Sequence, residues 1–233
     1  QFLILVAADL LINFTRMFKR NLLLIFLIAT FQQTLSAETV KVFDFTESEF
    51  ETLKVKKVRG ADAKTKYSLG KNEYGNFIRS ESENAASGLG KEIKINLSKS
   101  PFLNITWKVE KDLSGINENS KKGHDYAARV FVIKKTGATP LSNRAMNYVY
   151  SSNNEINSNQ PSPYTKKSID YVLSTTKENL NEWVTVKVNV KKHFKKFHGL
   201  DVNDIEGVAI MTDTDNSKKA AIAYYQNIYF SSE

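Results

Sequence analysis

The sequence has no cysteine and only three histidines, four prolines and ten glycines among its 233 residues. Without cysteine the chain cannot form a disulfide scaffold, a thiolate zinc site or a cysteine nucleophile. A lipoprotein anchor is excluded as well, because it needs a cysteine at the cleavage site. So few histidines also leave little room for a histidine-rich metal centre.

The remaining composition is that of an ordinary globular protein. Apolar residues make up 41% of the chain and charged residues 25%, and 33 Lys and Arg against 25 Asp and Glu give a net charge of +8. These values argue against disorder, and a chain of this length fits one hydrophobic core. Because the lysines are scattered, we expect no nucleic-acid partner.

The first part of the chain has the pattern of a leader. Residues 17–37 begin with a methionine and the basic pair Lys19 and Arg20, and continue into an apolar run at 22–31. That run is far shorter than the ~20 residues that span a bilayer as a helix, so a cleaved signal peptide is favoured over a permanent anchor. We interpret residues 1–16 as upstream sequence translated in front of the true start; the alternative is a second membrane segment.

The expected product is a periplasmic or secreted protein without a stable membrane anchor after cleavage, formed by one domain at residues 38–233. Apolar and polar residues alternate with a period of two over much of this domain, which indicates half-buried β-strands. The strands we expect cover residues 40–45, 76–82, 93–97, 103–109, 126–133, 145–150, 169–174, 184–190, 207–211 and 220–230.

No helical crossovers separate these segments, so a doubly wound α/β fold is excluded. The pattern predicts an all-β fold, a two-sheet antiparallel β-sandwich or jelly roll of about ten strands. One short helix is expected after residue 190, because Val190, Phe194 and Phe197 share a face and Gly199 can end it. Its other face is rich in lysine and could bind an acidic surface, but a helix covering one end of the sandwich is favoured.

Several segments together resemble a known bacterial family. Residues 123–132 read Gly-His-Asp-Tyr-Ala-Ala-Arg-Val-Phe-Val, residues 146–150 read Met-Asn-Tyr-Val-Tyr, and residues 209–216 read Ala-Ile-Met-Thr-Asp-Thr-Asp-Asn. These segments are similar to motifs of the family catalogued as Domain of Unknown Function 3047. Where that family usually has Gly-Asp, this chain has Gln226 and Asn227. The resemblance implies an exported β-sandwich similar to galactose-binding-like carbohydrate modules, and it implies no activity.

The acidic segment at the end of one expected strand has two interpretations. Asp213, Asp215 and Asn216 offer hard oxygen ligands of the kind that Ca²⁺ prefers. The lysines at 218 and 219 stand where a calcium loop would need glycine and further acids. A turn in which these side chains cap backbone N–H groups is therefore favoured. We expect no other cofactor.

Arg129 is a charged residue where an apolar one is expected, because it shares a strand face with Ala127 and Phe131. Asp125 lies on the same face but ~13 Å along the strand, too far for a direct contact. We therefore expect Arg129 to meet an acid from another strand, with Asp213 as the best candidate. This is either a buried ion pair or a guanidinium group that grips a carboxylate or sugar hydroxyls.

Many flat side chains accompany these charges, and sugar rings stack on such surfaces. Most should lie in the core, because they belong to alternating strands. Tyr164, in the turn after Ser162 and Pro163, is the aromatic residue that we most expect to be exposed. The aromatic residues considered are Trp107, Tyr126, Tyr148, Tyr150, Tyr164, Trp183 and Tyr225.

Catalytic patterns are weaker. The sequence has no Gly-x-Ser-x-Gly elbow, and His193 and His198 lie in the lysine-rich helix. His124 and Asp125 could form an acid–base pair, but this is a minor alternative.

These observations favour an exported, non-catalytic β-sandwich that binds a small molecule, above all a saccharide, on one sheet face. The first alternative is a glycan-active hydrolase or lyase that uses Asp125, Asp213 and Asp215 with Arg129. The second is a structural envelope protein. The expected ligand-binding residues are Asp125, Tyr126, Arg129, Asn147, Tyr148, Tyr164, Asp213 and Asp215.

Overall fold

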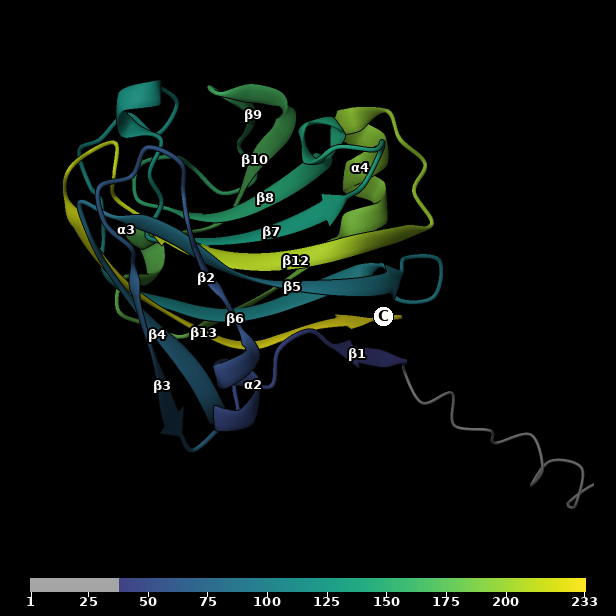
Figure 1. The fold of residues 1–233 in the computed structure, drawn as a ribbon, viewed down its shortest axis with the longest axis horizontal. Coiled ribbons are helices and arrows are strands. Elements are labelled where there is room, and N and C mark those ends of the chain that lie inside the picture. Colours follow the sequence, from purple (N-terminus) through teal and green to yellow (C-terminus); the bar gives the residue numbers. More distant parts are fainter. Residues whose placement is uncertain (1–37) are drawn as a thin grey trace, which may run out of the picture. The chain divides into compact units, whose positions relative to one another are not determined.

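The computed structural model describes residues 38–233, so the predicted leader lies outside the described residues. Two β-sheets face each other in this region (Figure 1). Sheet A contains, in spatial order, β11 (Val184–Asn189), β6 (Phe102–Lys111), β13 (Ala220–Ser231), β4 (Gly75–Glu83) and β3 (Lys66–Asn72), with β1 (Thr39–Lys41) also paired to β13. Sheet B contains β2 (Val55–Lys57), β5 (Ala86–Asn96), β12 (Asp204–Asp213), β7 (Ala128–Lys134), β8 (Arg144–Ser151), β10 (Thr165–Thr175) and β9 (Asn159–Ser162).

The predicted all-β sandwich is confirmed, with three strands more than the sequence indicated. β2, β3 and β9 were not expected, because two of them are very short and the third has little apolar alternation. The pairing also departs from a purely antiparallel sheet, since β10 runs parallel to β8. The chain leaves β8, forms β9 at the edge and returns as β10 in the gap between them, so β10 takes the direction of β8.

Alternation decides which side chains enter the core. Along β7, Ala128, Val130 and Val132 are buried in the cluster between the sheets. The residues between them, Arg129 and Phe131, therefore lie on the face of sheet B that points away from sheet A. We call this the outer face of sheet B.

The predicted aromatic core is present. Trp107 is fully buried with Tyr148, Tyr150 and Tyr225. The Trp107 indole Nε1 donates a hydrogen bond of 3.0 Å to Ser174 Oγ, so its one polar atom is satisfied.

The expected helix is α4 (Val190–His198), and Gly199 ends it in the left-handed region at φ 69°. Figure 1 shows this helix at one end of the sandwich. Its Phe194 side chain is buried. Shorter helices not expected from the sequence are α2 (Glu47–Thr52), α3 (Thr176–Asn179) and the 3-10 turns Lys121–Gly123 and Pro140–Ser142. Among residues 38–233, no helix has the length and apolar character needed to cross a membrane.

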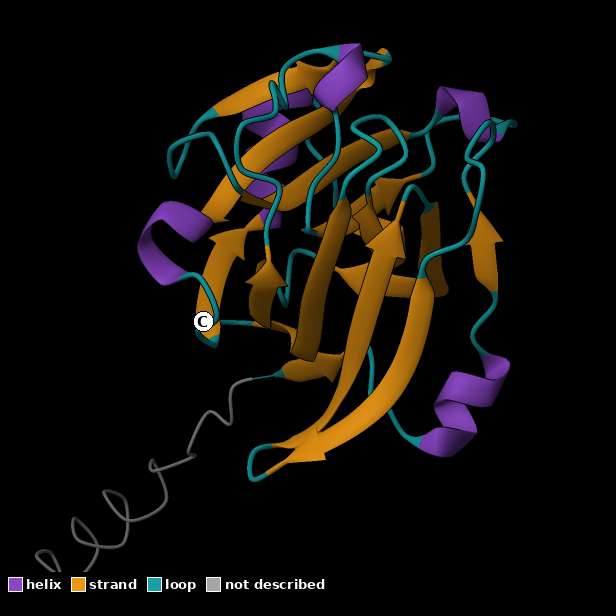
Figure 2. Ribbon diagram, turned by 90° about the vertical axis from the view of Figure 1, so that its left-hand side faces the viewer, coloured by secondary structure: helices purple, strands orange, loops and turns teal. Residues whose placement is uncertain are grey.

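Long loops gather at one end of the sandwich, as Figure 2 shows in the upper part of the view. One of them leads to His124 through Gly123, whose Cα packs so closely on the Asn117 backbone that a Cβ would clash there. The same loop carries Glu118, a buried carboxylate that accepts hydrogen bonds from the Ser152 backbone N–H and the Asn154 side-chain Nδ2. These contacts hold the loop against the end of β8.

Candidate functional site

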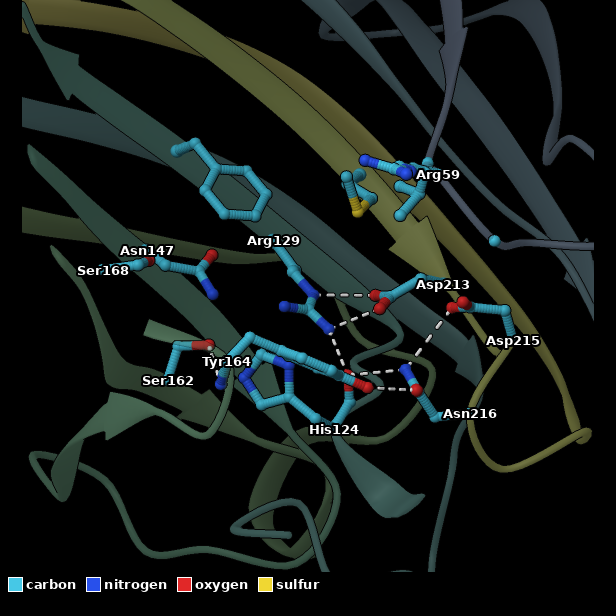
Figure 3. Close-up of a pocket in the computed structure, with 14 residues that line it drawn as sticks. Arg59, His124, Arg129, Asn147, Ser162, Tyr164, Ser168, Asp213, Asp215 and Asn216 are labelled. Carbon is cyan, nitrogen blue, oxygen red and sulfur yellow. Dashed lines mark hydrogen bonds and ion pairs between the residues drawn. The ribbon is translucent and has the colours of Figure 1, made fainter. Parts of the chain in front are cut away.

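A cleft of about 520 Å³ opens on the outer face of sheet B (Figure 3). Its floor comes from β7, β8 and β12 and consists of Arg129, Phe131, Asn147, Met211 and Asp213. The loop after β2 forms one wall with residues 58–60, and Ser162, Tyr164 and Ser168 form another. His124, Asp215 and Asn216 close one end.

The predicted pair between Arg129 and Asp213 is confirmed. Arg129 Nε donates to Asp213 Oδ1 at 2.7 Å, and Nη2 donates to Asp213 Oδ2. Nη2 also donates to the backbone oxygen of His124 at 2.7 Å. The two residues are only 3% and 4% exposed, so the pair forms a buried ion pair beneath the cleft. This bidentate arrangement fixes the plane of the guanidinium group.

Burial raises the pKa of Asp213 to about 7, although the charge of Arg129 acts in the opposite direction. The pKa of the neighbouring Asp215 is also raised, mainly by partial burial and then by the charge of Asp125. The acidic end of the cleft thus holds a proton more readily than an exposed carboxyl group does.

Asp170 organises the opposite side of the floor. Its Oδ2 lies 2.7 Å from His124 Nε2, and its Oδ1 accepts a hydrogen bond of 2.5 Å from Asn147 Nδ2. Strand register explains the second contact, because Asp170 of β10 is directly opposite Asn147 of β8. A His124–Asp125 pair was a minor alternative from the sequence; in the structure His124 pairs with Asp170 instead.

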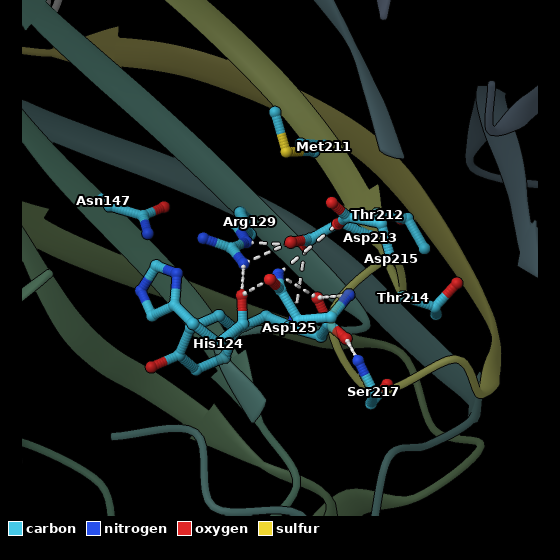
Figure 4. A network of polar contacts seen from close by, with 12 residues as sticks. His124, Asp125, Arg129, Asn147, Met211, Thr212, Asp213, Thr214, Asp215 and Ser217 are labelled. Carbon is cyan, nitrogen blue, oxygen red and sulfur yellow. Dashed lines mark hydrogen bonds and ion pairs between the residues drawn. The ribbon is translucent and has the colours of Figure 1, made fainter. Parts of the chain in front are cut away.

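Two polar atoms on this floor are left without a hydrogen-bond partner among the described residues. Asn147 is only 1% exposed, and its buried Oδ1 has no partner. The hydrogen bonds of Arg129 use Nε and Nη2, and Nη1 makes none with the described residues. Figure 4 shows the Arg129, Asn147 and His124 side chains converging at this point.

Asp125 supports the turn that closes the cleft. Its Oδ1 accepts from the backbone N and side-chain Nδ2 of Asn216, at 3.2 and 2.8 Å, and its Oδ2 accepts from Ser217 N at 2.5 Å. Asp125 is fully buried and does not line the cleft. The turn is therefore capped by an acid from another loop, whereas the sequence favoured capping by its own acids.

Two of the three candidate metal ligands, Asp213 and Asp215, come together with Asp125, and each of these acids offers an oxygen atom within 4.8 Å of the others. Most of these oxygens are already occupied. Both oxygens of Asp213 accept from Arg129, and both oxygens of Asp125 accept from the turn. A guanidinium group within the cluster also repels a second cation, so these residues do not suit Ca²⁺ well.

We accordingly expect no calcium-dependent stabilisation. A ligand that binds only the folded protein would raise its melting temperature. Melting curves recorded in millimolar CaCl₂ and in EDTA should coincide, and a melting temperature several degrees higher in calcium would restore the calcium interpretation.

The structure places six of the predicted site residues on the cleft: Arg129, Asn147, Tyr164, Asp213, Asp215 and Asn216. Tyr148 lies between the sheets, because alternation turns it away from Asn147, and so it cannot contact a ligand in the cleft. Tyr126 lines a separate, smaller cavity of about 140 Å³ instead. Its backbone N donates to Asp213 Oδ1, and its ring lies 4.6 Å from the Arg129 guanidinium carbon.

Four residues of the site were not predicted from the sequence: Asp170, Arg59, Phe131 and Ser168. The sequence does single out Asp170, because it is a charged residue between the apolar residues of an expected strand, as Arg129 is. Arg59 gave none, because it lies in a loop without a motif.

Comparison with solved structures found distant similarities. One is to a family 30 carbohydrate-binding module of a cellulosomal cellulase of Clostridium thermocellum, at 9% identity, 84% coverage of this chain, 98% of the other and a TM-score of 0.49. Another is to the xyloglucanase domain of NopAA from Sinorhizobium fredii, at 11% identity, 76% and 92% coverage and a TM-score of 0.43. Identities this low do not transfer a ligand or an activity. A comparison with curated proteins found no match.

The family suggested by the sequence motifs is matched over most of the chain. The model of the family described as protein of unknown function (DUF3047) matches residues 51–229. This range includes β2 to β12, most of β13 and all residues that line the cleft. The chain therefore belongs to the DUF3047 family.

Proposed function

We propose that the cleft on the outer face of sheet B binds a saccharide. The observation that carries the proposal is the buried, unpaired Asn147 Oδ1 on the same cleft floor as Arg129, whose Nη1 makes no described hydrogen bond. A buried acceptor without a partner destabilises a protein by about 1–3 kcal/mol, so a functional partner is expected to satisfy it. A hydroxyl group fits both atoms, because it donates to Asn147 and accepts from Arg129.

The remainder of the cleft supports the same class of ligand. Phe131 and Met211 give the floor an apolar part, and Tyr164 adds an exposed ring at the rim. Sugar rings combine apolar C–H faces with hydroxyl groups and match such a mixed surface. Phe131 lies directly opposite Asn147 across the strands, which puts the apolar part of the floor beside this acceptor.

The charges in the cleft favour a neutral saccharide over an acidic one. Arg129 is already paired with Asp213, and the carboxyl group of Asp215 offsets the charge of Arg59 on the cleft wall. The unpaired Asn147 Oδ1 accepts and cannot donate, so a ligand carboxylate placed there would be repelled. We further propose that this binding takes place outside the cytoplasm, because residues 17–37 have the sequence pattern of a leader.

A glycan array tests the proposal with one pair of tyrosine variants. Tyr164 at the cleft rim is 56% exposed, and Tyr74 in the β3–β4 turn is 72% exposed. Tyr164→Ala should weaken binding of the best glycan about tenfold, which corresponds to ~1.4 kcal/mol, because a ring at the site is lost. Tyr74→Ala removes an equivalent ring away from the cleft and should leave binding unchanged.

Other outcomes would favour the alternatives. Release of reducing ends from a bound glycan would indicate a glycan-active enzyme. A folded protein that binds no glycan on the array would favour a structural envelope protein and overturn the proposal.

A further inference from the structure

We propose that Asp170 sets the hydrogen-bond polarity of the cleft, so that its floor presents two acceptors side by side and selects a ligand with two adjacent hydroxyl groups. This inference rests on the proposed saccharide binding and makes the ligand class more specific, to a vicinal diol. Asp170 is buried at 2% exposure and does not line the main cleft, so it acts through its two neighbours as a positioning residue.

The orientation of Asn147 follows from the chemistry of Asp170. A carboxylate accepts hydrogen bonds and cannot donate them, so the Asn147 amide must turn its Nδ2 toward Asp170 Oδ1. Its carbonyl Oδ1 is then directed elsewhere, and it remains buried without a partner. The unpaired acceptor is thus a direct consequence of Asp170.

Asp170 also fixes the tautomer of His124. Its Nε2 lies 2.7 Å from Asp170 Oδ2, so this nitrogen carries the proton and donates it. Burial lowers the pKa of His124, which keeps the ring neutral near pH 7. Nδ1 is then left with a lone pair, and Figure 4 shows the ring beside Asn147 and Arg129.

His124 and Asn147 both line the cleft and are held by the two oxygens of a single carboxylate, so the proposal places their free acceptors side by side. Hydroxyl groups on adjacent carbons can donate one hydrogen bond to Asn147 Oδ1 and one to His124 Nδ1. One of the hydroxyl oxygens can also accept from Arg129 Nη1. A single hydroxyl, or two hydroxyls on opposite sides of a ring, leaves one acceptor unsatisfied.

Asp170→Asn tests this polarity with almost no change of shape. An amide has one accepting oxygen and one donating nitrogen, so it can hold only one of its two neighbours in the original orientation. Either the His124 proton moves to Nδ1 or the Asn147 amide reverses, and one acceptor of the cleft becomes a donor. The control Asp201→Asn removes the same charge from a side chain that is 67% exposed and does not line the cleft.

The probes are cis-1,2-cyclohexanediol and 1,4-cyclohexanediol, titrated to hundreds of millimolar into isotope-labelled protein. In the wild type and in Asp201→Asn, the 1,2-diol should shift the NMR signals of the Asn147 amide and His124 ring, and the 1,4-diol should have at least tenfold less effect. In Asp170→Asn this response should fall at least tenfold. The imidazole nitrogen shifts of the wild type should report a proton on Nε2, a readout that does not require any variant to fold.

Equal responses to both diols, no response to either, or a wild-type proton on Nδ1 would overturn the inference. So would full 1,2-diol binding by folded Asp170→Asn. If the 1,2-diol binds as expected but no glycan does, the saccharide proposal fails and the inference about polarity stands. If glycans bind equally to the wild type and to Asp170→Asn, the inference fails and the saccharide proposal stands.

Discussion

Arg129→Met is expected to lower the free energy of unfolding by about 3–5 kcal/mol, because it leaves the carboxylate of Asp213 buried without its partner. In a domain of this size such a loss lowers the melting temperature by roughly 6–20 °C. Guanidinium unfolding at pH 8, followed by tryptophan fluorescence, measures it directly. The matched control Arg79→Met breaks a partly exposed pair with Glu81 and should have an effect of about 1 kcal/mol or less.

The loss should also depend on pH. The folded pKa of Asp213 is about 7, above its ordinary value of 3.8. The stabilisation that comes from this raised pKa is therefore fully present below pH 3.8 and is lost as the pH rises through 7. Removing Arg129 raises the pKa of Asp213 in the folded protein further. The loss of unfolding free energy in Arg129→Met should therefore be constant well below pH 7 and grow above it. A deficit that shrinks as the pH rises would contradict the ion pair.

A second large effect is expected for Asp125→Ala. This substitution leaves the N–H donors of Asn216 and Ser217 without their acceptor, and hydrogen bonds to a charged group contribute about 1.5–3 kcal/mol each. We expect a destabilisation of about 3 kcal/mol, smaller than the sum because the freed turn can reach water.

The same variant should weaken glycan binding at least tenfold, because the turn carries Asp215 and Asn216 at the end of the cleft. Asp44→Ala is the matched control, since the Asp44 side chain is 52% exposed and its ion pair among residues 38–233 is with Lys41 at the surface. It should change neither stability nor binding. A stable Asp125→Ala protein with a normal melting temperature would show that the turn does not need this support.

Local patterns predicted the sandwich and the Arg129–Asp213 pair because both depend on alternation along single strands. Arg129 is conspicuous as a charge on an otherwise apolar face, and such a charge must find a partner when it is buried. The helix at Val190–His198 was equally readable, since its apolar spacing and Gly199 lie within one segment.

The rest of the site depends on how distant strands align. Asp170 meets Asn147 because β10 is parallel to β8 in one particular register, and no local pattern encodes that pairing. His124 therefore found its partner 46 positions away and not in the adjacent Asp125. Tyr148 shows the opposite error: its aromatic ring suggested a binding surface, but its neighbour Asn147 occupies the outer face and leaves Tyr148 for the core.

A crystal structure of the wild-type protein with the strongest neutral glycan from the array tests saccharide binding in the cleft. We predict a sugar in the cleft on sheet B, with one hydroxyl oxygen about 2.7–3.0 Å from both Asn147 Oδ1 and Arg129 Nη1. A sugar bound elsewhere, with Asn147 Oδ1 still unpaired, would contradict the account.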